Sequence, residues 1–232
     1  MKTTIQLLSV VLLTAINSFG QGSSEIQENI NLIKQNFTSS QASIKKYSWI
    51  ETTTTFLNGE QKSVAQNQCY YDVSGNLVKV PTGATTQAKT PGGIRGRIAA
   101  NKKEDIEAYI EKAKTQIKAY IPPQPSKLQE IYASGRVEIK VLDPGKKFEL
   151  DFFDYIKTDD LLAIQVDFVN KALMEYNINT YMDSPSDAVS LDVTFQNLPD
   201  GTLYSGHITF NAPSKKLKIV MVNSGYRLGT GQ

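Results

Sequence analysis

The sequence is poor in cysteine and histidine, the residues on which small disulfide-bonded domains and many metalloenzymes depend. Among 232 residues there is one cysteine, Cys69, and one histidine, His207. A single cysteine cannot form an internal disulfide. A lone histidine without a cysteine pair cannot form a histidine-based zinc site. Folding must therefore rely on a hydrophobic core, and we expect Cys69 to be a small buried residue of that core. The alternative is a reactive or intermolecular thiol.

An excess of either charge is also absent. The chain has 25 lysines and arginines against 23 aspartates and glutamates, and the basic residues are scattered. A nucleic-acid surface needs a basic stripe, so no nucleic-acid partner is expected. The sequence likewise offers no cofactor motif.

Long apolar runs are absent beyond the first twenty residues. There, Lys2 precedes an apolar stretch from Ile5 to Ile16, and Ser18-Phe19-Gly20 supplies small residues for cleavage. This layout predicts a secretory signal peptide over 1–20, cut after Gly20. The run is too short for a spanning helix; an uncleaved anchor or a buried helix is the alternative. We expect a soluble periplasmic or secreted protein, with 21–232 as a single domain.

Apolar spacing predicts three helices. Ile26, Ile30, Ile33 and Phe37 recur at steps of three and four residues, which predicts a helix over 24–37. A second stripe runs from residue 101 to 121 and stops at Pro122. A shorter helix over 126–133 should end at Gly135, because glycine suits the position after a helix.

Alternating apolar and polar residues predict strands in the rest of the chain. The run 47–57 leads into Asn58-Gly59, a strong hairpin signal, and further strands follow at 62–72 and 77–80. From residue 136 onward the chain alternates almost to its end. Alternation places one face in a core and the other in water, as in antiparallel sheets. The predicted class is α+β: a large curved antiparallel sheet, an unclosed half-barrel, with an N-terminal helix and a central helix pair on its concave face.

Residues 81–100 are rich in glycine and proline, which predicts a flexible loop inside the domain. The segment contains Arg95 and Arg97. One interpretation is a plain linker. The other is a mobile flap in which the two guanidinium groups meet an acidic head group.

Candidate catalytic groups are isolated. His207 shares the polar parity of its strand, and no serine-centred or cysteine-centred motif accompanies it. Asp183 and Asp187 flank a polar turn without the glycine-centred spacing of a calcium loop. Carboxylate pairs of the kind that hydrolyse glycosides occur in nearly every globular chain. We therefore expect no catalytic residues, no metal and no enzymatic activity.

The order of helix, meander, helix pair and long meander, with the segments Ser43-Ile44-Lys45-Lys46-Tyr47-Ser48-Trp49 and 164–173, resembles the periplasmic lipoprotein-carrier superfamily, the LolA/LolB-like half-barrels. The resemblance implies an incomplete barrel whose concave apolar face, lidded by helices, holds acyl chains or another apolar partner. Such carriers have a functional arginine in the early strands. Residues 47–80 contain none, so the resemblance implies the fold and a generic cavity rather than lipoprotein-carrier activity.

The leading hypothesis is a protein that binds an apolar ligand, a lipid or a lipidated protein in a helix-lidded cavity of the sheet. A second hypothesis is an envelope interaction or scaffold protein with a filled core, which acts through strand faces such as Thr52 and Thr54. The third is an exported hydrolase around His207. The sequence leaves the oligomeric state open. The candidate lining, chosen by parity and also compatible with ordinary core packing, is Trp49, Phe56, Tyr109, Ile110, Ile117, Phe152 and Tyr176.

Overall fold

A computed structural model describes residues 23–83, 86–87 and 93–229. The signal peptide expected over 1–20 lies outside these residues. The described helices are α1 (Ser23–Ser43), α2 (Gly93–Lys118) and α3 (Pro125–Ala133). The strands are β1 (Tyr47–Leu57), β2 (Glu60–Tyr71), β3 (Leu77–Pro81), β4 (Thr86–Gln87), β5 (Val137–Asp143), β6 (Lys147–Phe153), β7 (Leu161–Asp167), β8 (Ala172–Tyr181), β9 (Ala188–Asn197), β10 (Leu203–Ala212) and β11 (Leu217–Leu228).

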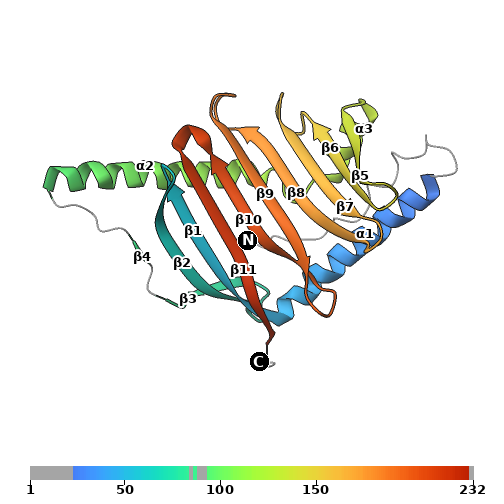
Figure 1. The fold of residues 1–232 in the computed structure, drawn as a ribbon, viewed down its shortest axis with the longest axis horizontal. Coiled ribbons are helices and arrows are strands. Elements are labelled where there is room, and N and C mark those ends of the chain that lie inside the picture. The colour runs from blue at the N-terminus through green and yellow to red at the C-terminus, as the bar shows by residue number, and fades with distance from the viewer. Residues whose placement is uncertain (1–22, 84–85, 88–92, 230–232) are drawn as a thin grey trace.

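All strands belong to one antiparallel sheet in the order β3-β2-β1-β11-β10-β9-β8-β7-β6-β5, and the short β4 pairs with β2. Apart from β1 with β11 and β4 with β2, neighbours in the sheet are also neighbours in the sequence. The two ends of this order, β3 and β5, do not pair with each other. The sheet is therefore curved but open, which confirms the predicted half-barrel (Figure 1).

The turns contain residues that adopt the positive φ values these positions require. Asn58 and Gly59 have φ values of 55° and 79°, as in the two-residue hairpin turns that match strand twist. Gly135 follows α3 with φ at 72°, a conformation that glycine adopts without strain. Both positions agree with the sequence prediction.

The three helices lie on one face of the sheet, which we call the inner face. The inward side chains Leu150, Ile164 and Leu191 pack against two buried clusters at once, so both clusters share that face. Helices α2 and α3 cross one end of the strands and α1 crosses the other (Figure 1). The cluster under α2 and α3 consists of Tyr109, Ala113, Ile117, Tyr120, Leu128, Ile131, Phe152, Tyr155, Leu162, Ile178, Val189, Phe210, Ala212 and Leu217.

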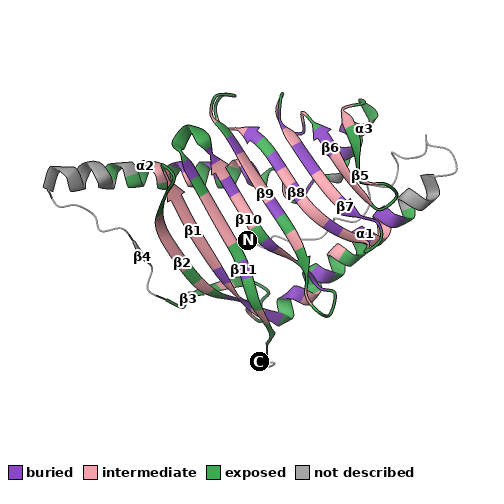
Figure 2. Ribbon diagram, in the orientation of Figure 1, coloured by how far each residue is buried: buried purple, intermediate pink, exposed green. Residues whose placement is uncertain are grey.

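The cluster under α1 is the second half of the core. Ile30 and Ile33 supply its helical side, and Phe37 packs at its margin. The strands supply the remaining members, Val166, Phe168, Leu173, Tyr176, Val193 and Leu203. Figure 2 shows buried residues concentrated in β6 to β9, whereas β1 to β3 are largely intermediate or exposed.

Two helix boundaries differ from the sequence prediction. Helix α1 continues to Ser43, six residues beyond the predicted end of the helix at Phe37. Helix α2 begins at Gly93 rather than Asn101, so residues 93–100, expected to belong to the flexible loop, are helical. After Gly93 the segment has one further glycine, Gly96, among residues that tolerate a helix. The prediction of a loop gave the glycines and prolines of 81–100 more weight than the helix propensity of the residues after Gly93. The division into signal peptide and single domain stays a prediction.

Candidate functional site

Side chains of the two buried clusters pack on the inner face beneath the helices. Five of the seven predicted lining residues belong to this packing. Tyr109, Ile117 and Phe152 are members of the cluster under α2 and α3, and Ile110 packs against it. Tyr176 belongs to the cluster under α1 and meets Phe195 edge to face, with ring centroids 5.4 Å apart. A ligand-lining role for these side chains stays a prediction.

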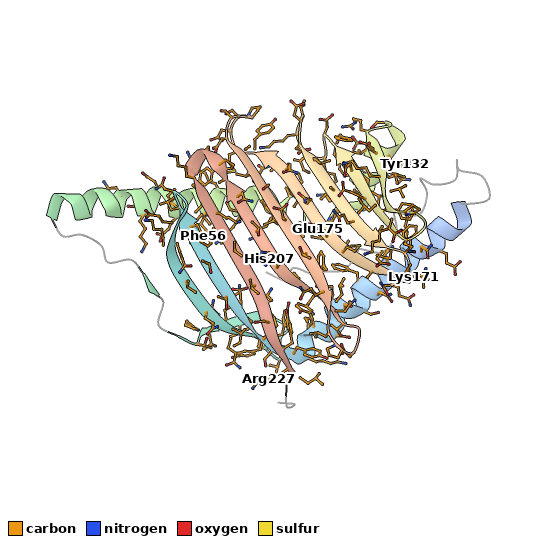
Figure 3. All side chains as sticks on the ribbon, viewed as in Figure 1. Phe56, Tyr132, Lys171, Glu175, His207 and Arg227 are labelled. Atoms are coloured by element: carbon orange, nitrogen blue, oxygen red, sulfur yellow. The ribbon has the colours of Figure 1, made fainter. Side chains whose placement is uncertain are left out.

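Trp49 and Phe56, the other two, lie on opposite faces of β1. Trp49 stacks on Tyr226 with ring centroids 5.5 Å apart, and its Nε1 donates to Asn223 Oδ1 at 3.1 Å. Phe56 is opposite Lys218, whereas its neighbour Leu57 is opposite the core residue Leu217. Because side chains alternate along a strand, Phe56 points to the outer face (Figure 3). The structure therefore places Phe56 on the opposite face of β1 from Trp49, and a ligand-lining role for either residue stays a prediction.

A half-open groove lies between α1 and two turns of the sheet, and we call it the α1 groove. It encloses about 430 Å³, within the range of about 300–1,000 Å³ that ligand pockets occupy. None of the seven predicted lining residues belongs to it. Three segments form its walls. Helix α1 contributes Ile33, Asn36, Phe37, Ser39, Ser40 and Ser43; the β7–β8 turn and the start of β8 contribute Asn170, Lys171, Ala172 and Leu173; the end of β9, the β9–β10 turn and the start of β10 contribute Asn197, Asp200, Gly201, Thr202 and Leu203.

Polar contacts join α1 to both turns. Asn36 Nδ2 donates to the backbone oxygen of Lys171 at 3.0 Å. The Lys171 ammonium in turn donates to the side-chain oxygen of Asn29. Farther along the helix, Ser40 Oγ accepts a hydrogen bond from the backbone N–H of Leu203 at 2.9 Å. The helix is therefore joined by hydrogen bonds to the segments on both sides of the groove.

Aspartates fix the shapes of the two turns. Asp167 Oδ1 accepts the backbone N–H groups of Val169 and Asn170 at 2.8 and 2.9 Å. Asp200 Oδ1 accepts the N–H of Thr202 at 2.9 Å. A side chain that satisfies backbone donors of its own turn holds that turn in one conformation. The rim of the groove is therefore preformed rather than loose.

The charged groups of the groove are one lysine and one aspartate, Lys171 and Asp200. Tyr47 OH donates to Asp200 Oδ2 at 2.6 Å, and this hydrogen bond holds the pKa of Asp200 below its ordinary value. The Asp200 carboxylate thus already has hydrogen-bond donors within the chain. The ammonium of Lys171, bound to a neutral amide oxygen, is the charge with capacity for a ligand.

The floor of the groove is apolar. Leu173 and Leu203 are buried there, and Ile33 and Phe37 approach from the helix. Phe37 meets Phe195 edge to face, with ring centroids 6.0 Å apart. These residues also belong to, or pack against, the cluster under α1. The groove is thus a polar mouth that opens onto the apolar inner face.

Arg95 and Arg97 lie in the first turns of α2. In Figure 1 that end of α2 projects past β1 and β2, whereas α1 contacts β8 and β10. The structure therefore does not place the two arginine positions beside the α1 groove. Their expected contact with an acidic head group stays a prediction.

His207 lies on the outer face, opposite Thr194 on one side and Val222 on the other (Figure 3). Its side chain is exposed and forms no hydrogen bond with any residue in the described part of the chain.

The polar turn between Asp183 and Asp187 contacts α2. Asp187 accepts hydrogen bonds from Tyr109 OH at 2.8 Å and from Ser214. Burial, followed by the bond to Asp187, raises the pKa of Tyr109 to about 12. The turn between Asp183 and Asp187 therefore binds a helix of the fold.

Two further observations concern metals and membranes. Within the described ranges, no group of three or more histidine, cysteine, aspartate or glutamate side chains has the geometry of a metal site. None of the helices in the same ranges combines the length and apolarity needed to cross a bilayer.

Comparisons with known proteins give similarities of fold. No family model and no curated protein matches the sequence. Among solved structures, an outer membrane lipoprotein-sorting protein domain from Vibrio parahaemolyticus is 9% identical, with a TM-score of 0.41 over 89% of this chain and 94% of the other. A LolA superfamily protein from Nitrosomonas europaea is 9% identical, with a TM-score of 0.38 over 86% and 94%. A DUF1329 family protein from Desulfovibrio piger is 6% identical, with a TM-score of 0.38 over 90% and 95%. These similarities are similarities of fold.

Proposed function

We propose that this chain is an exported binding protein without enzymatic activity, which holds an amphiphile (a lipid or the acyl group of a lipidated protein) beneath α1. The observation that carries the proposal is the α1 groove. Its polar mouth continues into an apolar floor, and that floor belongs to the cluster that α1 covers. An amphiphile has the same two parts in the same order. Export of the chain by the signal peptide over 1–20 is part of this proposal.

The free energy gained by burying the apolar side chains of α1 can be compared with that gained by burying an acyl chain in their place. Ile30, Ile33 and Phe37 are the apolar side chains that α1 contributes. Burial stabilises each by roughly 1.5–3 kcal/mol, or about 5–9 kcal/mol for all three, as an upper estimate. A buried methylene contributes about 0.8 kcal/mol, so an acyl chain of roughly six to eleven carbons matches the helix. Common acyl chains reach or exceed that length, so the apolar surface that such a chain can bury is comparable with that of α1.

The polar mouth determines which head group is preferred. Lys171 can exchange its bond to the neutral side chain of Asn29 for an anionic oxygen of a ligand. Hydrogen bonds to an ionised partner are stronger than those between neutral groups. Asn36 and Ser39 add further polar groups beside Lys171. We therefore expect a preference for a carboxylate or phosphate head over a neutral one.

Titration of the processed chain with a dansyl-labelled fatty acid tests this function. We expect saturable fluorescence at one probe per chain. Ser39→Trp fills the groove at an exposed position of its wall and should weaken binding about tenfold or more. Gln41→Trp, exposed on the same helix outside the groove, is the matched control and should bind as the unchanged protein does.

Two results would contradict the proposal. The first is no saturable binding by the folded protein. The second is equal weakening by Ser39→Trp and Gln41→Trp, which would place the probe elsewhere. Either result would favour the second hypothesis, an interaction protein with a filled core.

A further inference from the structure

Strand β5 forms one end of the sheet order, and its outer edge has no partner strand within the described residues. Ile139 and Val141 point to the inner face, because they are opposite Leu150 and Phe148 of the core side. They are nevertheless 49% and 59% exposed. A strand edge with unpaired backbone groups and exposed apolar side chains is a template for another strand.

The opposite end of the sheet is protected. Strand β3 spans Leu77–Pro81, only 5 residues, and ends in a proline that cannot donate to a ladder. Its Lys79 is turned inward to Glu51, at 2.6 Å. Strand β5 spans 7 residues and contains no proline. Of the two edges, β5 is the one that can accept a strand.

The sequence of β5 is complementary to itself in one antiparallel register. With Ile139 opposite Ile139 of a second copy, Val137 falls opposite Val141, and Glu138 falls opposite Lys140. The apolar pairs then lie together on the inner face, and two identical ion pairs form on the outer face. Opposite charges and apolar residues placed directly across an antiparallel pair stabilise it. A two-fold axis repeats each contact, as an isologous interface requires.

Lysine on an edge strand usually discourages pairing, but Lys140 is held back over its own sheet. Its ammonium lies 2.5 Å from Asp151 Oδ2 and 3.1 Å from Glu149 Oε1. Asp151 is buried, and its Oδ1 has no hydrogen-bond partner among the described residues. Glu138 forms no ion pair in the same part of the chain. In the register above, Glu138 of one copy approaches Lys140 of the other, whose ammonium has three N–H donors and contacts two carboxylates of its own chain.

We propose that two copies of this chain pair through β5, antiparallel about Ile139, so that the two sheets continue into one. The interface is independent of the α1 groove, which lies beside β8 and β10. Because single-strand pairing buries a small area, the dimer belongs to the weaker, concentration-dependent class.

Sedimentation velocity of the processed chain over two decades of concentration tests the pairing. We expect a monomer–dimer equilibrium. Glu138→Lys places two lysines opposite each other twice and should raise the dimer dissociation constant about tenfold or more. Glu104→Lys makes the same charge change at an exposed position of α2 and should leave it unchanged. Thermal unfolding of both variants checks that each is folded.

Oxidative crosslinking tests the register. Ile139→Cys should form a dimer disulfide with itself. Val141→Cys should not do so alone, but should crosslink when mixed with Val137→Cys. The buried Cys69 should leave the unchanged protein uncrosslinked. A protein that remains monomeric throughout, a dimer insensitive to Glu138→Lys, or a dimer in which Ile139→Cys fails to crosslink would overturn the proposal.

Discussion

The backbone N–H of Leu203 donates to Ser40 Oγ at 2.9 Å, across 163 residues of sequence. This bond joins the end of α1 to the first residue of β10. Ser40 is buried, so water cannot replace it as a partner when its hydroxyl is removed. The bond is one of the polar contacts that hold α1 over the inner face.

Removal of the Ser40 hydroxyl should loosen the helix. Ser40→Ala leaves the N–H of Leu203 without a partner, and we expect a loss of about 1–3 kcal/mol in the free energy of unfolding. Urea denaturation measures this loss, and hydrogen exchange of α1 amides should accelerate. Ser39→Ala, at an exposed position, is the control and should change stability by less than about 0.5 kcal/mol. Equal stability of the two variants would contradict the role of the bond.

Asp160 should be among the most sensitive positions at the other end of the sheet. It is buried, and it accepts Tyr120 OH at 2.5 Å and the N–H of Lys157 at 2.7 Å. Asp160→Asn places amide protons against these donors, so we expect a loss of about 2–4 kcal/mol. The neighbouring exposed Asp159→Asn should change stability by less than about 0.5 kcal/mol. Thermal and urea unfolding measure both, and similar losses would contradict this account.

The bond between Tyr47 and Asp200 predicts a pH dependence. Because the hydrogen bond from Tyr47 lowers the pKa of Asp200 in the folded chain, its stabilisation is present above the unfolded pKa, about 3.9. It is lost as the pH falls through the lower folded pKa. Tyr47→Phe should therefore be less stable at neutral pH, with the difference closing in acid. A carbon-13 titration should show the pKa of Asp200 rising in Tyr47→Phe; an unchanged pKa would refute the assignment.

The arginines of α2 provide a test of the flap hypothesis. If the flap meets an acidic head group, Arg95→Ala combined with Arg97→Ala should weaken binding of an anionic fatty acid several-fold and leave a neutral monoacylglycerol unaffected. If Lys171 of the α1 groove meets that head group instead, the double variant should bind the anionic probe as the unchanged protein does. The control replaces Lys112 and Lys118 of the same helix with alanine. Unchanged binding of the anionic probe by the arginine double variant would remove the flap from the account.

The elements of the fold could be predicted because their signals are local. Asn58-Gly59 marks a hairpin through backbone conformation alone, and the alternation of Val189, Leu191 and Val193 marks a strand with one buried face. The pairing of β1 with β11 has no such signal. It joins residues 47 and 228 across nearly the whole chain, and its register depends on which side chains share the inner face.

The candidate site was the harder part to predict. The α1 groove forms where Phe37, Lys171 and Asp200 meet from three separate segments, and their proximity follows only from the assembled sheet. A partial signal existed in the strand–Asp–turn–strand segment, because Asp167 shapes the turn that forms one wall. Parity held a second signal that the choice of lining missed: Trp49 is an odd and Phe56 an even position of one strand, so the two side chains face opposite sides.

The central claim is that α1 covers a site for an amphiphile, and native mass spectrometry of the protein purified from its own host tests it most directly. We expect a processed chain carrying one lipid-sized adduct that collisional activation releases. We also expect that Ser39→Trp loses the adduct while Gln41→Trp retains it. A clean apo mass for the folded, unchanged protein, under conditions that preserve a known lipid complex, would contradict the claim.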